Sequence, residues 1–218
     1  MIQHHSIKVL KTAHFYSLGK LNQSTKEIWI IFHGYGQLAS RIISKFTSIQ
    51  NEDRYLLALE GLSRFYWGDV TSSQVAASWM TSQNRLDEIV DFCNYIQTVY
   101  DDLQSKTNDD VKIVLFGFSQ GVATLMRWVH QNQPAFHSGI LWAGGIPEDI
   151  SFLELKPYFK DKSLHFVYGN EDQFLTEKYM VFQKSVMQKN EFNIGMHEFQ
   201  GKHVVDREVL KEMVKNLI

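Results

Sequence analysis

Short apolar runs alternate with amphipathic segments along most of the chain. Five runs are apolar on both alternating faces, as in strands buried between two layers of helices: 28–32, 55–59, 111–116, 139–143 and 164–168. Alternation over 192–196 predicts one further strand. Apolar residues at spacings of three and four predict helices over 84–103, after 119, over 176–189 and over 209–217. This order predicts an α/β fold with a mostly parallel sheet and helices on both faces.

The N-terminal part breaks this rhythm. Residues 7–10 and 14–18 form two short apolar runs with no helical segment between them, which predicts an antiparallel hairpin at the sheet edge. The chain has 218 residues, of which 44% are apolar and 21% charged, as expected for a single domain over 1–218. The predicted elements use most of this length, so we expect no separate cap domain and an open, shallow active site.

Charge and cysteine content limit the partners and the cellular compartment that we expect. Lys and Arg number 22 and Asp and Glu 24, so the net charge of -2 gives no general attraction to nucleic acid or anionic membranes. The single cysteine, Cys93, excludes an intrachain disulfide and favours a reducing compartment. No signal segment or apolar run of about 18 residues is present, which predicts a cytoplasmic protein without stable membrane insertion. Oligomeric state stays open.

The sequence Gly117-Phe118-Ser119-Gln120-Gly121 lies between a predicted strand and a predicted helix. In this context G-x-S-x-G predicts a tight turn that presents the Ser119 hydroxyl above the sheet, beside the helix N-terminus. The alternative is a glycine-bounded turn whose serine only caps the helix. The strand before it and the helix after it favour a nucleophile.

A serine nucleophile needs a base, and the base needs an orienting acid. In this type of fold the acid and then the histidine follow the serine along the chain. Asp172 follows the strand over 164–168, with Glu171 and then Asp149 as competitors, and His203 precedes the last helix. We therefore predict the triad Ser119, Asp172 and His203.

The loop His33-Gly34-Tyr35-Gly36 follows the first long strand. Its position predicts that the Tyr35 N–H, with Gly34 as the neighbouring alternative, joins the Gln120 N–H in binding an oxyanion. We expect the His33 side chain to hold this loop by hydrogen bonds.

The same loop also fits a dinucleotide-binding fingerprint, with Gly34, Gly36 and Ala39 followed by Glu60 at the end of the next strand. Alone, this pattern predicts an NAD(P)-binding oxidoreductase. It leaves the serine turn, Asp172 and His203 unexplained, so it is the weaker hypothesis.

With these loops placed, the chain resembles α/β-hydrolases over nearly its full length, specifically the small carboxylesterase/phospholipase group that includes acyl-protein thioesterases. The resemblance implies a three-layer α/β-hydrolase fold and hydrolysis of small-molecule carboxylic esters or thioesters without metal or organic cofactor. Val122, and Gln173-Phe174-Leu175 after the acid, depart from residues common in that group. A thioesterase, a peptidase and a non-catalytic binding relative therefore stay open beside a serine esterase.

Two segments are candidates for choosing the substrate. Phe65, Trp67 and Trp79 lie in 62–80, which has no helical periodicity, and we expect these aromatic rings either to wall an acyl pocket or to pack the loop onto the domain. The stretch 146–159 is a second possible rim.

Overall fold

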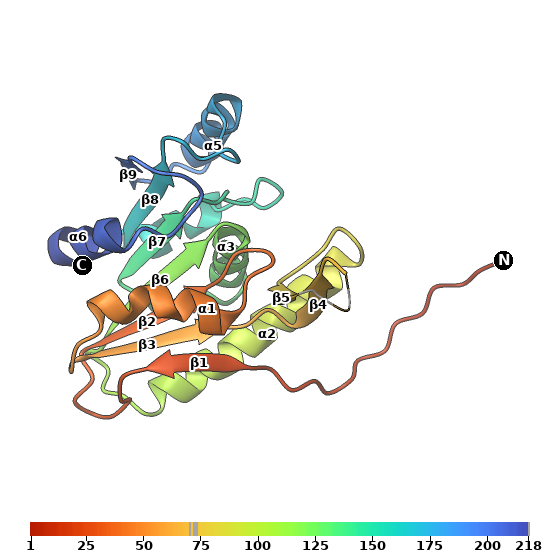
Figure 1. The fold of residues 1–218 in the computed structure, drawn as a ribbon, viewed down its shortest axis with the longest axis horizontal. Coiled ribbons are helices and arrows are strands. Elements are labelled where there is room, and N and C mark those ends of the chain that lie inside the picture. The colour runs from red at the N-terminus through yellow and green to blue at the C-terminus, as the bar shows by residue number, and fades with distance from the viewer. Residues whose placement is uncertain (70, 72–73, 218) are drawn as a thin grey trace.

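The computed structural model describes residues 1–69, 71 and 74–217, and in these residues a seven-stranded sheet has the order β1-β3-β2-β6-β7-β8-β9 (Figure 1). Its strands are β1 (Phe15–Leu18), β2 (Glu27–Phe32), β3 (Arg54–Leu59), β6 (Lys112–Phe118), β7 (Ser138–Trp142), β8 (Ser163–Gly169) and β9 (Ile194–Phe199). The strands from β2 to β9 pair in parallel, and β1 pairs antiparallel with β3. The predicted α/β fold and all six predicted long strands are confirmed.

Helices cover both faces of the sheet. The long helices are α2 (Arg85–Gln104), α3 (Gln120–Asn132), α5 (Glu177–Lys189) and α6 (Arg207–Leu217), and the short ones are α1 (Ala39–Ile43), η1 (Ser44–Ile49), η2 (Leu153–Leu155) and α4 (Lys156–Phe159). Phe46 of η1 packs edge-on against Trp29, whereas Trp128 of α3 packs against Phe32 of the same strand. Successive odd and even strand positions face opposite sides, so η1 and α3 lie on opposite faces.

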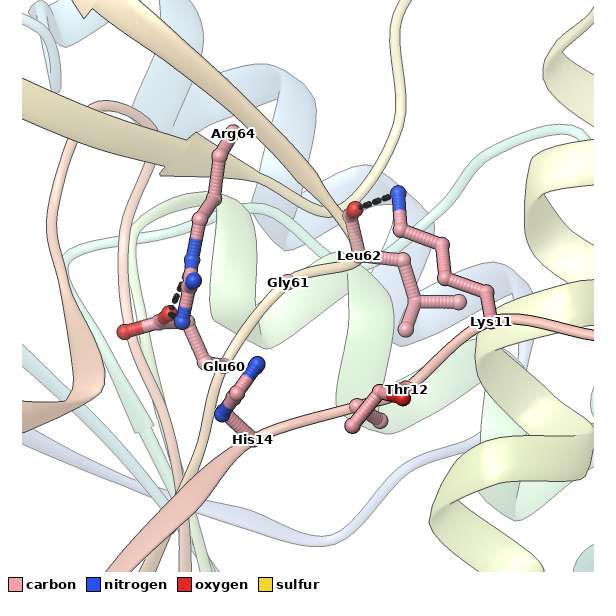
Figure 2. Close-up of a pocket in the computed structure, with 8 residues that line it drawn as sticks. Lys11, Thr12, His14, Glu60, Gly61, Leu62 and Arg64 are labelled. Atoms are coloured by element: carbon pink, nitrogen blue, oxygen red, sulfur yellow. Dashed lines mark hydrogen bonds and ion pairs between the residues drawn. The ribbon is translucent and has the colours of Figure 1, made fainter.

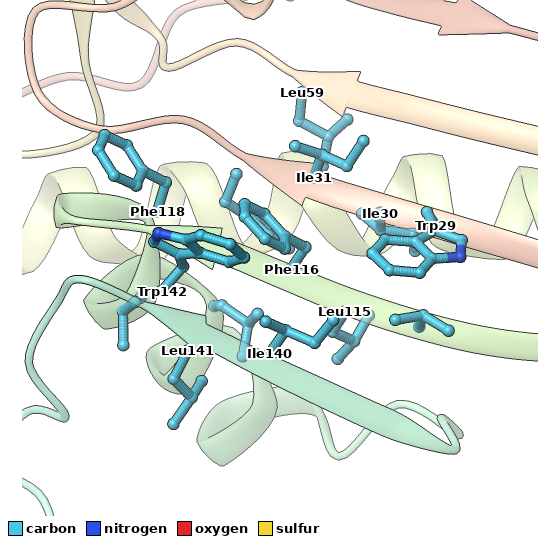
Figure 3. Packing of buried hydrophobic residues seen from close by; sticks show 14 of the residues in the cluster. Trp29, Ile30, Ile31, Leu59, Leu115, Phe116, Phe118, Ile140, Leu141 and Trp142 are labelled. Atoms are coloured by element: carbon cyan, nitrogen blue, oxygen red, sulfur yellow. The ribbon is translucent and has the colours of Figure 1, made fainter. Parts of the chain in front are cut away.

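Large aromatic side chains fill the layer under η1. Phe116 and Trp142 lie on the neighbouring strands β6 and β7 with ring centroids 5.8 Å apart (Figure 3). Phe46 packs against Phe116 from above at 4.9 Å. This rigid core fixes the carboxyl ends of the parallel strands, where the candidate functional loops begin.

The predicted antiparallel strand over 14–18 at the sheet edge is confirmed as β1, but its predicted hairpin partner over 7–10 is wrong. Residues 7–10 form no strand, and β1 pairs directly with the free edge of β3. Ile7, Val9 and Leu10 are exposed on an arm that extends from the body (Figure 1). The sequence between the two runs, Lys11-Thr12-Ala13, lacks the glycine, asparagine or aspartate that tight hairpin turns require.

The segment 62–80 has more regular structure than its sequence indicates. β4 (Ser63–Trp67) and β5 (Gln74–Ser78) form a separate two-stranded antiparallel sheet beside α2 (Figure 1). A bridge between Gln37 and Ala77 ties β5 to the loop after β2. In the stretch 146–159, η2 and α4 form short helical turns. None of the helices in the described residues is long and apolar enough to cross a membrane.

Candidate active site

Ser119 lies at the turn between β6 and α3. Its backbone is left-handed, with φ 53° and ψ -118°, a conformation that costs energy for a residue with a Cβ. A Cβ on Gly121 would lie 2.2 Å from the Phe32 carbonyl oxygen, and one on Gly117 would lie 2.7 Å from the Gly121 oxygen. Glycine is therefore required at both positions, as the G-x-S-x-G pattern predicts.

His203 lies between Ser119 and Asp172. Its Nε2 is 3.0 Å from Ser119 Oγ, and its Nδ1 is 2.6 Å from Asp172 Oδ2. A carboxylate accepts hydrogen bonds, so Nδ1 carries the proton and Nε2 is free to accept the serine proton. The second Asp172 oxygen accepts the Phe174 backbone N–H at 2.8 Å, which fixes the carboxylate plane.

The loops after β8 and β9 pack closely enough to hold this geometry. The Glu171 N–H donates to the Gly201 oxygen at 2.9 Å, and a Cβ on Gly169 would lie 2.2 Å from that oxygen. Trp142 Nε1 donates to the Val204 carbonyl oxygen at 2.9 Å, which anchors the residue after His203. His203 is thus held from both sides of its loop.

The competing acids and histidine lie elsewhere. Glu171 bonds to Gln200, and Asp149 pairs with Arg85 at 2.8 Å and with Arg127 at 2.5 Å. Burial opposes ionisation of Asp149, but the hydrogen bond and charge of Arg127, together with the charge of Arg85, outweigh it and hold the Asp149 pKa below its usual value. His197 lies within β9 and its Nε2 is 3.0 Å from His165 Nδ1. Of these candidates, only Asp172 meets His203.

The loop after β2 lies against the nucleophile, because a Cβ on Gly34 would come 3.1 Å from Ser119 Cβ. The Gly34 N–H donates to Gln37 Oε1 at 3.0 Å, and the Gly36 N–H donates to the Ala77 oxygen at 2.9 Å. Among the described residues, the Tyr35 N–H donates no backbone hydrogen bond. Tyr35 rather than Gly34 is therefore the available donor of this loop.

Gln120, the first residue of α3, has two kinds of hydrogen-bonding group. Its backbone N–H is in the first turn, where helix N–H groups have no intrahelical acceptor. Its side chain, which no sequence pattern singles out, accepts the Trp79 N–H at 3.1 Å and donates to the Met80 oxygen at 2.8 Å. The Gln120 side chain thereby links the segment directly after β5 to the start of α3.

His33 is buried beneath the loop. Its Nε2 accepts the Gly61 N–H at 2.9 Å, so the proton resides on Nδ1, which donates to the Gly34 oxygen at 2.7 Å. Burial lowers the His33 pKa to about 4, so the ring is neutral at pH 7. These contacts confirm that His33 holds the loop by hydrogen bonds.

Trp79 supports the same loop from inside the domain. Its side chain is 1% exposed, and its indole N–H donates to the His33 backbone oxygen at 2.9 Å. Its ring packs against Phe32 and Phe92. Of the two roles expected for Trp79, its burial fits packing of the 62–80 segment onto the domain rather than a pocket wall.

Phe65 and Trp67 lie beside Tyr35 instead. The Tyr35 ring stacks on Phe65 at 5.4 Å and meets the edge of Trp67 at 5.5 Å, and the Trp67 side chain is 56% exposed. A further exposed ring, Phe174, lies 4.7 Å from His203. Aromatic rings therefore lie both against His203 and beside the loop after β2.

The dinucleotide hypothesis does not fit this arrangement. The Trp67 ring covers Gly36, where a Cβ would lie 2.4 Å from the ring, so the space for a pyrophosphate is filled. Glu60 is 2% exposed, accepts the Ala39 N–H at 3.1 Å and pairs with Arg64 (Figure 2). The hollow beside this pair, about 170 Å³, is lined by Lys11, His14, Glu60 and Arg64 rather than by triad residues. Glu60 thus anchors α1 and cannot also bind a ribose.

In the part of the chain described, no group of three or more His, Cys, Asp or Glu side chains is arranged to hold a metal ion. Residues 20–218 match the profile of the Phospholipase/Carboxylesterase family of α/β-hydrolases. The chain belongs to this family. A search of curated proteins gave no match.

Solved structures similar to this chain share its fold at low identity. Acyl-protein thioesterase 2 from Zea mays has a TM-score of 0.70 and 14% identity, over 94% of this chain and 97% of its own. A phospholipase/carboxylesterase from Dyadobacter fermentans has a TM-score of 0.67 and 15% identity, over 96% and 98%. The Bacillus cereus carboxylesterase has a TM-score of 0.65 and 13% identity, over 93% and 92%. These likenesses establish the α/β-hydrolase-like fold.

Proposed function

We propose that the chain is a serine hydrolase that cleaves carboxylic esters through a Ser119-His203-Asp172 triad. The observation that carries this proposal is the continuous hydrogen-bonded path from Ser119 Oγ through both His203 ring nitrogens to Asp172. Membership of the Phospholipase/Carboxylesterase family supports the same reaction class. The strained serine turn and the N–H groups around it supply what acyl transfer needs.

In the first half-reaction, Ser119 Oγ bonds to the ester carbonyl carbon while its proton passes to His203 Nε2. The Tyr35 and Gln120 N–H groups stabilise the negative oxygen of the tetrahedral intermediate. The bond to the alcohol then breaks, and His203 gives its proton to the departing oxygen. Asp172 stabilises the imidazolium throughout.

In the second half-reaction, water loses a proton to His203 Nε2 and attacks the acyl carbon. The second tetrahedral intermediate collapses, Ser119 Oγ recovers the proton from His203, and the carboxylic acid leaves. The serine proton leaves on the alcohol and a proton from water replaces it, so Ser119, His203 and Asp172 end the cycle in their starting protonation states and the cycle needs no resident cofactor.

We further propose that Phe65 and Trp67 contact the acyl or aryl part of the substrate. Trp67 is exposed and Phe65 is half-buried, and both rings lie beside Tyr35, whose N–H is a proposed oxyanion donor. A thioester is the second candidate substrate, because the fold is similar to that of a plant acyl-protein thioesterase. The same triad chemistry applies to an alcohol or a thiol leaving group.

A substrate panel tests this proposal. Wild type and Ser119→Ala are assayed with nitrophenyl esters of acetate, octanoate and benzoate. The same two proteins are assayed with acyl thioesters and aminoacyl anilides. We expect turnover of esters that falls by at least about 10³-fold in Ser119→Ala and is unchanged in Ser185→Ala, an exposed serine of α5. Preference for thioesters or anilides would change the substrate class, and turnover indifferent to Ser119 would refute the proposal.

A further inference from the structure

We infer that His165 and His197 form a second site, which binds a divalent transition-metal ion of tetragonal geometry, Cu²⁺ or Ni²⁺, between His165 Nδ1 and His197 Nε2. The two residues lie on β8 and β9, the last two strands of the sheet (Figure 1). The site is independent of the proposed function, because it uses no triad residue and no part of the loop after β2.

The register of the two strands brings the histidine rings together. His165 of β8 pairs with Gly195 of β9, and Val167 pairs with His197. Residues paired in register point to the same face of a sheet, so both histidines lie on one face and stand diagonally across the strand pair. His165 Nδ1 lies 3.0 Å from His197 Nε2. Two imidazole nitrogens that can each give a lone pair therefore converge on one point.

Gly195 leaves the space between these nitrogens open. A Cβ on this residue would lie 3.0 Å from His197 Nε2 and 3.4 Å from His165 Nδ1. The Gly195 φ is not positive, so the backbone conformation does not require glycine. Glycine weakens a strand interior and often marks a place where a ligand comes close to the backbone. Gly195 is exposed, so an ion has a path to the nitrogens from solvent.

The distance between the nitrogens favours a tetragonal ion. Imidazole nitrogens bind metal ions at about 2.0–2.1 Å, so nitrogens 3.0 Å apart subtend about 91–97° at a shared ion. Neighbouring ligands in square-planar or octahedral geometry subtend about 90°, and Cu²⁺ and Ni²⁺ adopt such geometry with nitrogen ligands. A tetrahedral Zn²⁺ would instead require nitrogens about 3.3–3.4 Å apart.

Water is expected to complete the coordination. In the part of the chain that the structure describes, no third His, Cys, Asp or Glu joins the pair in a metal-binding group. An ion held by two imidazoles and several waters is exchangeable, and it takes no part in the proposed hydrolysis. It would link the edge strand β9 to β8, so its binding should stabilise the folded chain.

Both rings can give a lone pair at neutral pH. Burial lowers the pKa of His165, and the neighbouring His197 lowers it further; burial also lowers the pKa of His197. Neutral rings have no extra proton to lose before they bind an ion. Ser163 Oγ lies 2.7 Å from His165 Nε2, where it accepts the N–H that remains when Nδ1 binds the ion. Such a partner holds the ring of a metal ligand in orientation.

Metal titration of the full chain tests the site. The parent protein carries His4→Ala and His5→Ala, because two adjacent exposed histidines on the N-terminal arm would compete for the ion. Cu²⁺, Ni²⁺ and Zn²⁺ are each titrated into it by calorimetry in a buffer that does not bind metals. We expect one Cu²⁺ per chain, Ni²⁺ at least as tight as Zn²⁺, and a melting temperature that rises with Cu²⁺.

Two substitutions remove the site in different ways. Gly195→Ala keeps both histidines and fills the space between them, whereas His197→Ala removes one ligand. We expect the Cu²⁺ affinity to fall at least about tenfold in each, because even a partner behind a ligand is worth about 10–100-fold in metal affinity. The matched control is His14→Ala, an exposed histidine outside the pair, which should bind Cu²⁺ within about twofold of the parent.

Electron paramagnetic resonance of the Cu²⁺ complex identifies the ligands independently of affinity. We expect two nitrogen donors in the parent and one fewer in His197→Ala, with circular dichroism showing that every variant is folded. Cu²⁺ binding that is absent from the folded parent, or that is unchanged in both Gly195→Ala and His197→Ala, would overturn the inference. Tetrahedral Zn²⁺ bound more tightly than Ni²⁺ would overturn the assigned geometry. Ester turnover of the metal-free parent reports separately on the proposed function.

Discussion

His203 Nδ1 lies 2.6 Å from Asp172 Oδ2, and the Asp172 side chain has no solvent-exposed surface. A buried carboxylate at this distance fixes the histidine ring and its tautomer. The neighbouring Glu171 lies outside this contact, although it directly precedes Asp172 in the sequence and bonds to Gln200.

The first prediction concerns this pair. Asp172→Asn removes the charge that stabilises the imidazolium and permits the wrong histidine tautomer, so kcat for ester hydrolysis should fall about 10⁴-fold. Steady-state kinetics on a nitrophenyl ester measure the effect. Glu171→Gln, the matched control, should stay within twofold of wild type, and equal losses in both variants would contradict the assignment of the acid.

The second prediction concerns Trp67. Its removal in Trp67→Ala should lower kcat/KM about tenfold for benzoate and octanoate esters but less than threefold for acetate, because apolar contact is lost only with the larger acyl groups. Acetate also reports any loosening of the Gly36 loop that Trp67 covers. Tyr66→Ala is the control, since Tyr66 points to the other face of β4. An equal loss on all three esters would exclude Trp67 from the acyl site.

The third prediction concerns the Gln120 side chain. Gln120→Ala breaks its bonds to Trp79 and Met80 and should lower the free energy of unfolding by about 1–3 kcal/mol, measured by urea denaturation. Gln120→Glu keeps the acceptor for the Trp79 N–H but not the donor to Met80. The exposed Gln188→Ala should be neutral, and a neutral Gln120→Ala would show that the fastening is energetically unimportant.

The fourth prediction concerns pH. The His33 pKa is about 4 in the folded chain and about 6.5 in the unfolded chain, so only the unfolded state gains this proton between those values. Stability from His33 is therefore complete above pH 6.5 and is lost as pH falls to 4, by about 3 kcal/mol in total.

Urea unfolding of wild type and His33→Gln at pH 7 and pH 4.5 measures this pH-dependent contribution of His33 to the free energy of unfolding. The stability gap between the two proteins should narrow at pH 4.5, because the variant lacks the titrating ring. His165 and His197, whose pKa values burial also lowers, contribute to both proteins and cancel in the difference. A gap independent of pH would contradict the burial of a neutral His33.

Most of the fold, and the loops that hold the candidate triad, could be predicted from the sequence for physical reasons. A parallel strand that is buried on both faces must be mostly apolar along its length. For this reason β2, β3, β6, β7 and β8 can be recognised in the sequence as apolar runs. The turn around Ser119 can be recognised in the sequence because its close backbone contacts admit only glycine at 117 and 121. Chain order then placed Asp172 and His203 in the loops where the structure brings them to Ser119.

The missed features depend on contacts between segments far apart in the chain. The pairing of β1 with β3 rather than with residues 7–10 was missed, because β1 is a mostly exposed edge strand whose partner lies about 40 residues further along the chain. The β4–β5 pair was missed as well, and a bridge from Gln37 to Ala77 ties it to the loop after β2. The bond from Gln120 to Met80, the tautomer of His33 and the burial of Trp79 each arise only after the chain has folded. No local pattern encodes them.

A fluorophosphonate probe distinguishes a nucleophilic Ser119 from an inert one, because it forms a bond only with an activated serine oxygen. Native wild type, Ser119→Ala and Ser185→Ala are labelled, digested and mapped by mass spectrometry. We expect one adduct on Ser119 in wild type and in Ser185→Ala, none in Ser119→Ala, and loss of labelling after denaturation. A folded wild-type protein that acquires no adduct on Ser119 would contradict it and favour a non-catalytic binding relative.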